Sequence, residues 1–141
     1  DHGHERDVQS VIVDSSAVIA ILTREPRAAQ LLEALQTSVN PRISAGNWLE
    51  VSMVCVSRGL SATSGEIDAL PSQLGLGVIE FTPEHAAHAA RAFERYGRGL
   101  HPAKLNYGDC MAYATAKLAR EPLLYIGDDF TLTDIESALK A

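Results

Sequence analysis

Residues 10–22 read Ser-Val-Ile-Val-Asp-Ser-Ser-Ala-Val-Ile-Ala-Ile-Leu, which is a short apolar run, an acid, two hydroxyl residues and a second apolar run. The first run has the length and residue types of a buried strand. Ser15 and Ser16 can cap a helix that continues through the second run. The stretch therefore predicts a strand over 10–13, an acid at its carboxyl end, and a helix over 17–22.

The same alternation of strand and helix continues along the chain. Further strands are predicted over 41–44, 77–81 and 123–126, and further helices over about 26–35, 45–58, 63–75, 83–97, 107–120 and 133–139. Thr82-Pro83 is typical of a helix start, and Pro122 of a helix end. Strands that alternate with helices form parallel sheets covered on both faces. We therefore expect an α/β fold.

Length and composition bound the class of protein. The chain has 141 residues, which suits one domain over 10–141, and we set residues 1–9 aside as a loose tail or cloning remnant. The two cysteines form no C-x-x-C pair, which favours a reduced, cytoplasmic setting. No apolar stretch is long enough for a bilayer, so we expect no membrane association. A net charge of −6 argues against a sequence-reading DNA-binding protein but is compatible with a metal-dependent nuclease.

Acids occupy four places in the chain at which a function other than surface solubility can be considered. Asp14 and the pair Asp128-Asp129 follow predicted strands, and functional groups gather at the carboxyl ends of parallel strands. Glu50 lies in the apolar run 48–56, where a lone carboxylate costs several kcal/mol unless it is paired, protonated or bound to a cation. Asp109 lies in the first turn of its helix, where the helix dipole alone favours an acid. Each acid taken alone also fits an ordinary loop or a solvated helix edge.

Taken together, the acids favour a particular metal chemistry. Carboxylates are hard oxygen ligands that suit Mg²⁺ or Mn²⁺, whereas no His or Cys stands at a spacing typical of zinc sites. Crowded carboxylates repel one another unless a cation neutralises them. A pair of such cations can activate water for the hydrolysis of a phosphodiester. Spacing alone does not establish that the four acids meet.

The chain resembles PIN-domain proteins, specifically the VapC-type toxin ribonucleases of type II toxin–antitoxin systems. The matching segments occur in the family's order and together span about residues 10–137. They are residues 11–17, 48–50, 105–110, 123–130 and 133–135.

The resemblance implies a PIN-like three-layer α/β/α fold with a central parallel sheet of about four to five strands. It also implies an Mg²⁺- or Mn²⁺-dependent endoribonuclease that hydrolyses RNA by metal-activated water. Asp14, Glu50 and Asp109 would be catalytic metal ligands. Asp129 best matches the family's fourth acid, and Asp128 is the rival for that role.

Further expectations concern supporting residues and partners. The resemblance gives Ser16 a part in orienting the site, and implies an RNA substrate such as tRNA or rRNA, a homodimer, and a VapB-type antitoxin whose tail covers the acids. Asn106 could hydrogen-bond a ligand or a neighbouring acid, or could simply cap its helix. Residues 84–104 are locally basic and could contact phosphates, or could form a solvated helix face. The basic residues concerned are Arg91, Arg95, Arg98 and Lys104.

Two other functions remain open. A non-catalytic, antitoxin-binding regulatory module would keep the fold but take up no Mn²⁺ specifically. A phosphoacceptor receiver domain would need an acidic pair after its first strand and a lysine after a late strand. The first strand here yields the single acid Asp14, so the receiver domain ranks below the other two functions.

Overall fold

The computed structural model describes residues 10–60 and 63–139, and its centre is a parallel sheet with strand order β3-β2-β1-β4. The register pairs Ile12 with Leu123 and Ser44 with Ile79. Because all pairs are parallel, the carboxyl ends of the strands lie along one edge of the sheet. The strands are β1 (Ile12–Val13), β2 (Arg42–Ser44), β3 (Gly77–Ile79) and β4 (Leu123–Leu124).

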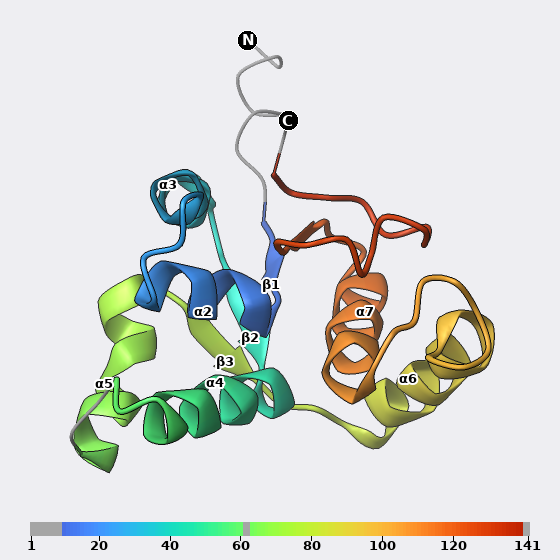
Figure 1. Cartoon of the computed structure of the whole chain (residues 1–141), viewed down its shortest axis with the longest axis horizontal. Helices are drawn as coiled ribbons and strands as arrows, with labels where there is room; N and C mark the ends of the chain where they lie inside the picture. The colour runs from blue at the N-terminus through green and yellow to red at the C-terminus, as the bar shows by residue number, and fades with distance from the viewer. Residues whose placement is uncertain (1–9, 61–62, 140–141) are drawn as a thin grey trace, which may run out of the picture.

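Helices cover both faces of this sheet, so the predicted three-layer α/β/α arrangement is confirmed (Figure 1). Helices α2 to α5 pack on one face, and α6 and α7 pack against each other on the opposite face. The helices are α2 (Ser15–Leu22), α3 (Ala28–Thr37), α4 (Ala45–Ser57), α5 (Ser64–Leu74), α6 (Pro83–Tyr96) and α7 (Tyr107–Ala119).

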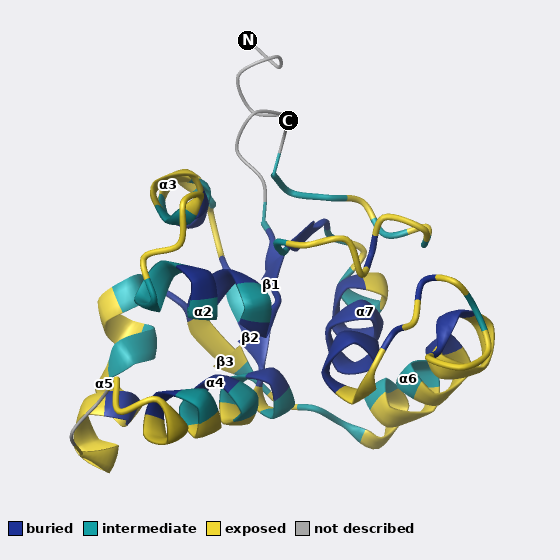
Figure 2. Cartoon of the chain, in the orientation of Figure 1, coloured by how far each residue is buried: buried dark blue, intermediate teal, exposed yellow. Residues whose placement is uncertain are grey.

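The layers follow from the alternation of side chains along β1. Val11 and Val13 belong to the core under α2 to α5, whereas Ile12 belongs to the core under α6 and α7. Successive side chains of a strand point to opposite faces, so an all-apolar strand needs cover on both sides. Figure 2 shows β1 and most of α7 as buried, whereas β3 at the edge of the sheet is exposed.

β3 and β4 end two residues earlier than the sequence predicts, at Ile79 and Leu124, whereas β1 ends at Val13 as predicted. β4 ends at Leu124. Beyond it, the N–H of Ile126 donates to the Ser16 hydroxyl (3.2 Å) and not to a carbonyl of a neighbouring strand. β1 ends at Val13 because Asp14 is already the N-cap of α2, a role that the sequence had assigned to the serines. Both strand ends thus pass directly into the loops that carry acids.

The helix predicted over 133–139 is wrong. Thr133 accepts a hydrogen bond from the N–H of Ile135 through its own hydroxyl, a local bond that competes with helix formation. The following residues extend along the free edge of β4, where the N–H of Leu123 donates to the carbonyl of Glu136 and the N–H of Ala138 donates to the carbonyl of Leu123. Satisfying the backbone groups of an edge strand outweighs a weak helical pattern.

Three of the helix caps that the sequence predicts are confirmed in the described part of the chain. Thr63, Thr82 and Asn106 cap the helices that follow them. Cys55 and Cys110 are buried free thiols. None of the helices there combines the length and hydropathy needed to cross a bilayer. The proposed tail, residues 1–9, lies outside the described residues.

Candidate active site

Asp14 stands at the point where β1 becomes α2. Its Oδ2 accepts a hydrogen bond from the N–H of Ser16 (3.1 Å), which fixes the carboxylate at the helix N-terminus. The side chain is only 3% exposed. Its second oxygen, Oδ1, is buried and accepts no hydrogen bond from any residue in the described ranges. Leaving a carboxylate oxygen buried and unpaired is costly, so this atom calls for a positively charged partner.

Glu50 reaches the same region from α4. The Ser15 hydroxyl donates to its Oε1 at 2.6 Å, which links α4 to the start of α2. The carboxylate also lies against the first turn of α7, because a Cβ built on Gly108 would stand 2.6 Å from Oε1. The absence of a side chain at residue 108 therefore creates the room in which Glu50 sits.

Asp109 is held by the cap of α7. Its N–H donates to Oδ1 of Asn106 (2.9 Å), and its own Oδ2 accepts from the N–H of Asn106 (3.1 Å). This reciprocal pair is a capping box, with an aspartate at the third helical position. The side chain of Asn106 thus caps the helix, and its backbone N–H is the group that binds the Asp109 carboxylate.

The four acids act on one another electrostatically. Burial, reinforced by the charges of Glu50 and Asp129, raises the pKa of Asp14 to about 6. Burial, reinforced by the charges of Asp14, Asp129 and Glu50, raises the pKa of Asp109 to about 7. The fold therefore brings Asp14, Glu50, Asp109 and Asp129 close enough to act on one another electrostatically.

These carboxylates are not yet arranged as ligands. Over residues 10–60 and 63–139, no three side chains of His, Cys, Asp or Glu surround a point where a metal ion could sit. Glu50 is engaged by the hydroxyl of Ser15.

Asn47 is a residue of the site that sequence reasoning missed. It is 1% exposed, and its Nδ2 donates to the carbonyl of Gly108 (3.0 Å), so it joins α4 to α7. Its Oδ1 accepts from the hydroxyl of Ser44, which is also the N-cap of α4. The sequence shows that Asn47 lies three residues after the serine that caps α4. It does not show that the side chain of Asn47 binds the carbonyl of Gly108, which is distant in the sequence.

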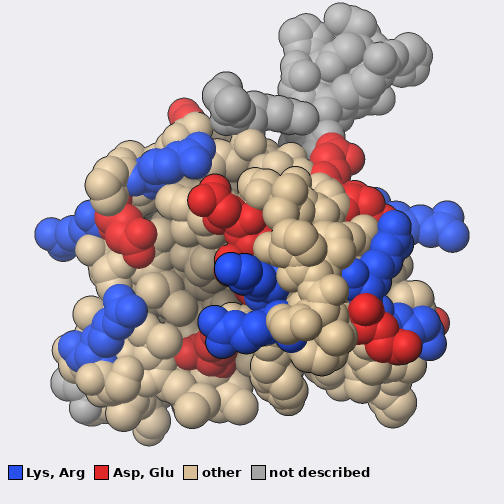
Figure 3. All heavy atoms as spheres, turned by 45° about the vertical axis from the view of Figure 1, so that its right-hand side comes forward, with Lys and Arg blue, Asp and Glu red and all other residues tan. Residues whose placement is uncertain are grey.

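Ser16 and the basic residues take separate positions. Ser16 binds the backbone just after β4, as described above, and so joins the loop of Asp14 to the strand that leads to Asp129. Arg95 lies over the ring of Tyr96 (4.9 Å) and 3.9 Å from Asp134. Arg91, Arg98 and Lys104 are exposed, and form no ion pair with another described residue. Figure 3 shows basic and acidic side chains interspersed on the face that α6 and α7 turn forward.

Comparison with known proteins identifies the family. The family model "PIN domain" matches residues 11–136 of the chain. The chain belongs to the PIN-domain family. This assignment agrees with the order of its strands and helices, and with the meeting of acids from segments that are far apart in the sequence.

Among PIN-domain proteins, the chain is similar to VapC ribonucleases. It is 46% identical to ribonuclease VapC36 of Mycobacterium tuberculosis over 127 residues, which are 89% of this chain and 91% of the relative. It is 44% identical to ribonuclease VapC42 of the same species over 129 residues, which are 91% of this chain and 98% of the relative.

Two solved structures share the PIN fold. One is Mycobacterium tuberculosis VapC20, a sarcin–ricin loop-cleaving toxin, with a TM-score of 0.72 and 13% identity over 89% of this chain and 95% of that chain. The other belongs to a toxin–antitoxin complex from Klebsiella pneumoniae, with a TM-score of 0.66 and 21% identity over 88% of this chain and 92% of that one. At these identities the likeness concerns the fold alone.

Proposed function

We propose that the chain is a VapC-type endoribonuclease that depends on Mg²⁺ or Mn²⁺ and acts as the toxin of a toxin–antitoxin pair. The observation that carries the proposal is the buried, unpaired Oδ1 of Asp14 among three other carboxylates. Such a group is tolerated when a cation neutralises it. The relatives named VapC ribonucleases support RNA as the substrate.

The residues present fit a divalent cation. Asp14 and Asp109 would hold it from the ends of β1 and α7, Glu50 would join after leaving Ser15, and Asp129 would complete the set in place of Asp128. Carboxylate oxygens without His or Cys suit Mg²⁺ or Mn²⁺. When bound there, the cation supplies an activated water and neutralises charge on the phosphodiester.

The chain's own residues prepare this chemistry. The backbone N–H of Ser16 and the backbone N–H of Asn106 each bind one oxygen of an acid, so Asp14 and Asp109 each keep their second oxygen for a ligand. Both carboxyl groups must be deprotonated to bind a cation, and their raised pKa values make that loss of protons part of binding.

The proposal includes two protein partners. A cognate VapB-type antitoxin is supported by the likeness to a chain from a toxin–antitoxin complex. A second copy of the chain is supported by exposed apolar side chains at helical spacing along α4, because a row of such residues on a small domain marks an interaction surface. We call this row the α4 stripe; it consists of Leu49, Met53 and Val56.

The test is RNA cleavage by the purified protein with and without Mn²⁺, together with Mn²⁺ binding by calorimetry. We expect Asp14→Asn and Asp109→Asn to abolish cleavage and to weaken Mn²⁺ binding strongly, and Asp129→Asn to reduce both. Asp128→Asn is the matched control, since it removes an adjacent acid outside the proposed ligand set, and it should retain activity.

Two results would contradict the proposal. Undiminished cleavage by Asp14→Asn and Asp109→Asn would remove the site. A folded wild-type protein that takes up no Mn²⁺ and cleaves no RNA, yet binds its antitoxin, would indicate the non-catalytic regulatory module.

A further inference from the structure

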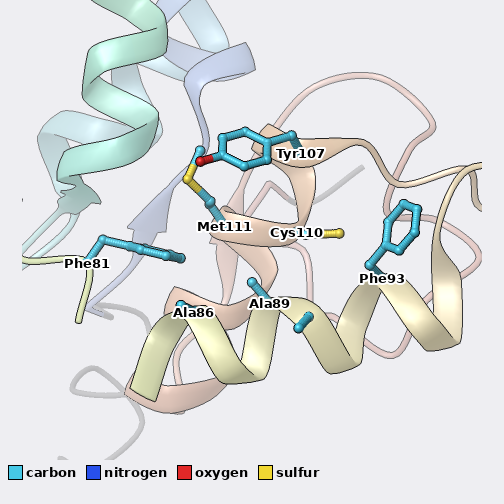
Figure 4. Close-up of a pocket in the computed structure, with 8 residues that line it drawn as sticks. Phe81, Ala86, Ala89, Phe93, Tyr107, Cys110 and Met111 are labelled. Atoms are coloured by element: carbon cyan, nitrogen blue, oxygen red, sulfur yellow. The ribbon is translucent and has the colours of Figure 1, made fainter. Parts of the chain in front are cut away.

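An apolar pocket of about 450 Å³ lies between α6 and α7. This volume is within the range of small-molecule binding sites. The pocket is not part of the acidic site, although α7 forms a wall of both. Figure 4 shows its lining, which comprises Phe81, Ala86, Ala89, Ala90, Phe93, Tyr107, Cys110 and Met111.

The walls are suited to a flat aromatic ligand. Phe81, Phe93 and Tyr107 contribute three rings, and in Figure 4 the Met111 thioether and the Cys110 sulfur lie between them. Thioethers and aromatic faces attract one another, and burial raises the pKa of Cys110 to about 11, so its thiol stays neutral. Tyr107 is 82% exposed although it is large and aromatic, so its ring is accessible to a ligand.

The pocket adjoins the acidic site. A second hollow of about 680 Å³ is lined by Glu50, Asn106 and Gly108, and shares Tyr107 and Met111 with the apolar pocket. Glu50 is the acid that lines this second hollow, whereas the side chain of Asp109 lies on another face of α7 from Tyr107 and Met111. A strand whose phosphate lies beside Glu50 would therefore pass Tyr107 and bring its next base to the pocket.

Aromatic rings are the part of single-strand binding sites that stacks on bases without regard to sequence. Arg91 is exposed on α6, but it stands two residues from the lining positions Ala89 and Phe93 and so lies on another face of the helix. The rings, and not a basic cluster, are therefore the feature of the pocket that fits a nucleobase.

We propose that this pocket receives one nucleobase of the RNA, from a nucleotide next to the cleaved phosphodiester. The inference rests on the proposed ribonuclease function and adds a base-binding subsite to it. Stacking on the rings of the pocket fixes the strand so that the scissile phosphate lies in the second hollow beside Glu50. The pocket therefore contributes to the choice of cleavage position.

The test places a large side chain in the pocket and leaves the buried residues of the core unchanged. Ala90→Phe adds a ring at an exposed lining position, and Ala87→Phe adds the same ring at an exposed position of α6 outside the lining. The substrate is a short RNA that contains the cleavage site of the wild-type protein, found by sequencing the 5′ ends of its products. Parallel substrates carry a single abasic ribose at each position flanking the cut.

We expect one abasic position to lower kcat/KM of the wild-type protein about tenfold, in line with base–aromatic stacking. Ala90→Phe should show the same loss on intact RNA and no further loss on the abasic RNA, while Ala87→Phe behaves as wild type. Mn²⁺ affinity should be equal in all three proteins.

Three outcomes would overturn the subsite. Ala90→Phe could cleave intact RNA as wild type does. All abasic substrates could be cleaved equally. Ala90→Phe could instead change the mass of the protein in solution, which would make the pocket an interface between copies. Absence of cleavage by the wild-type protein itself would refute the ribonuclease proposal, and is seen before any variant is made.

Discussion

Asp14 and Asp109 each stand at the N-terminus of a helix, and this position shapes their chemistry. Backbone N–H groups bind one oxygen of each carboxylate, which favours the charged form, while burial and neighbouring acids favour the protonated form. Burial prevails, so both carboxyls have raised pKa values. A cation reverses this balance, because it replaces repulsion among the acids by attraction.

A pH dependence of stability follows. A carboxyl whose pKa is raised on folding stabilises the folded state below its ordinary pKa of 3.8, and this stability is lost as the pH rises through about 6 for Asp14 and about 7 for Asp109. We therefore expect the free energy of unfolding of the metal-free protein to fall between about pH 4 and pH 7. Urea unfolding at several pH values measures it.

The control for the pH prediction is Asp14→Asn. In this variant the free energy of unfolding should decrease less over the same pH range, by on the order of 3 kcal/mol. Mn²⁺ at pH 8 should restore the lost stability of the wild type by binding only the folded state. A wild-type protein that becomes more stable as the pH rises through 6 to 7, without metal, would contradict these assignments.

Gly108 gives a prediction about a single methyl group. In Gly108→Ala the new Cβ would meet Oε1 of Glu50 at 2.6 Å, so the carboxylate must move. We expect Mn²⁺ affinity and the rate of RNA cleavage to fall at least about tenfold. The higher helix propensity of alanine should raise the free energy of unfolding by at most about 1 kcal/mol. Calorimetry with Mn²⁺ and cleavage rates measure the two effects.

Gly65→Ala is the comparison variant for this prediction. Residue 65 lies in the first turn of α5, where a Cβ would stand an ordinary 3.8 Å from Oγ1 of Thr63. It should leave Mn²⁺ binding and cleavage unchanged. Equal losses in both variants would show that the effect at residue 108 is not a local one on Glu50.

At the scale of elements, the site depends on how α4 meets α7. Glu50 and Asp109 belong to these two helices, and the buried amide of Asn47 links them through the carbonyl of Gly108. Gly46 allows the close approach, since a Cβ there would stand 2.5 Å from the sulfur of Met111. The distance between Glu50 and Asp109 is thus set by residues that are not acids.

Asn47→Ala tests this link. The variant leaves the carbonyl of Gly108 and the hydroxyl of Ser44 without their buried partner, so we expect a loss of about 1 to 3 kcal/mol in the free energy of unfolding. Mn²⁺ affinity should fall as well. Asn40→Ala, at an exposed position before β2, is the control and should change neither quantity.

The sequence predicts those elements whose signal is local. Strand runs, helix caps such as Thr82 and the acid after β1 all depend on neighbouring residues, and the structure contains them. The segment 133–139 fails because its conformation is decided by the edge of β4, which is distant in sequence. Asn47 and Gly108 escape notice for the same reason, since their roles exist only where two helices meet. Resemblance, and not spacing, led from separate acids to a common site.

For the molecule as a whole, charge and apolar surface set the partners. A net charge of −6 repels RNA at long range, so the proposed ribonuclease would depend on local features, namely a cation held by the acids and exposed basic residues such as Arg91 and Arg98. The α4 stripe is a separate feature. Leu49, Met53 and Val56 are each at least 60% exposed, an arrangement that costs solubility unless another surface covers it.

Met53→Lys therefore tests the proposed homodimer. Met53 is 62% exposed at the centre of the α4 stripe, so a lysine there is harmless to the free chain but places two like charges near the centre of a two-fold interface. We expect light scattering after size exclusion to give twice the chain mass for the wild type and the single mass for Met53→Lys. Val39→Lys, at a 64% exposed residue after α3, is the matched control and should remain dimeric. A monomeric wild type, or equal dissociation in both variants, would exclude the α4 stripe as the dimer contact.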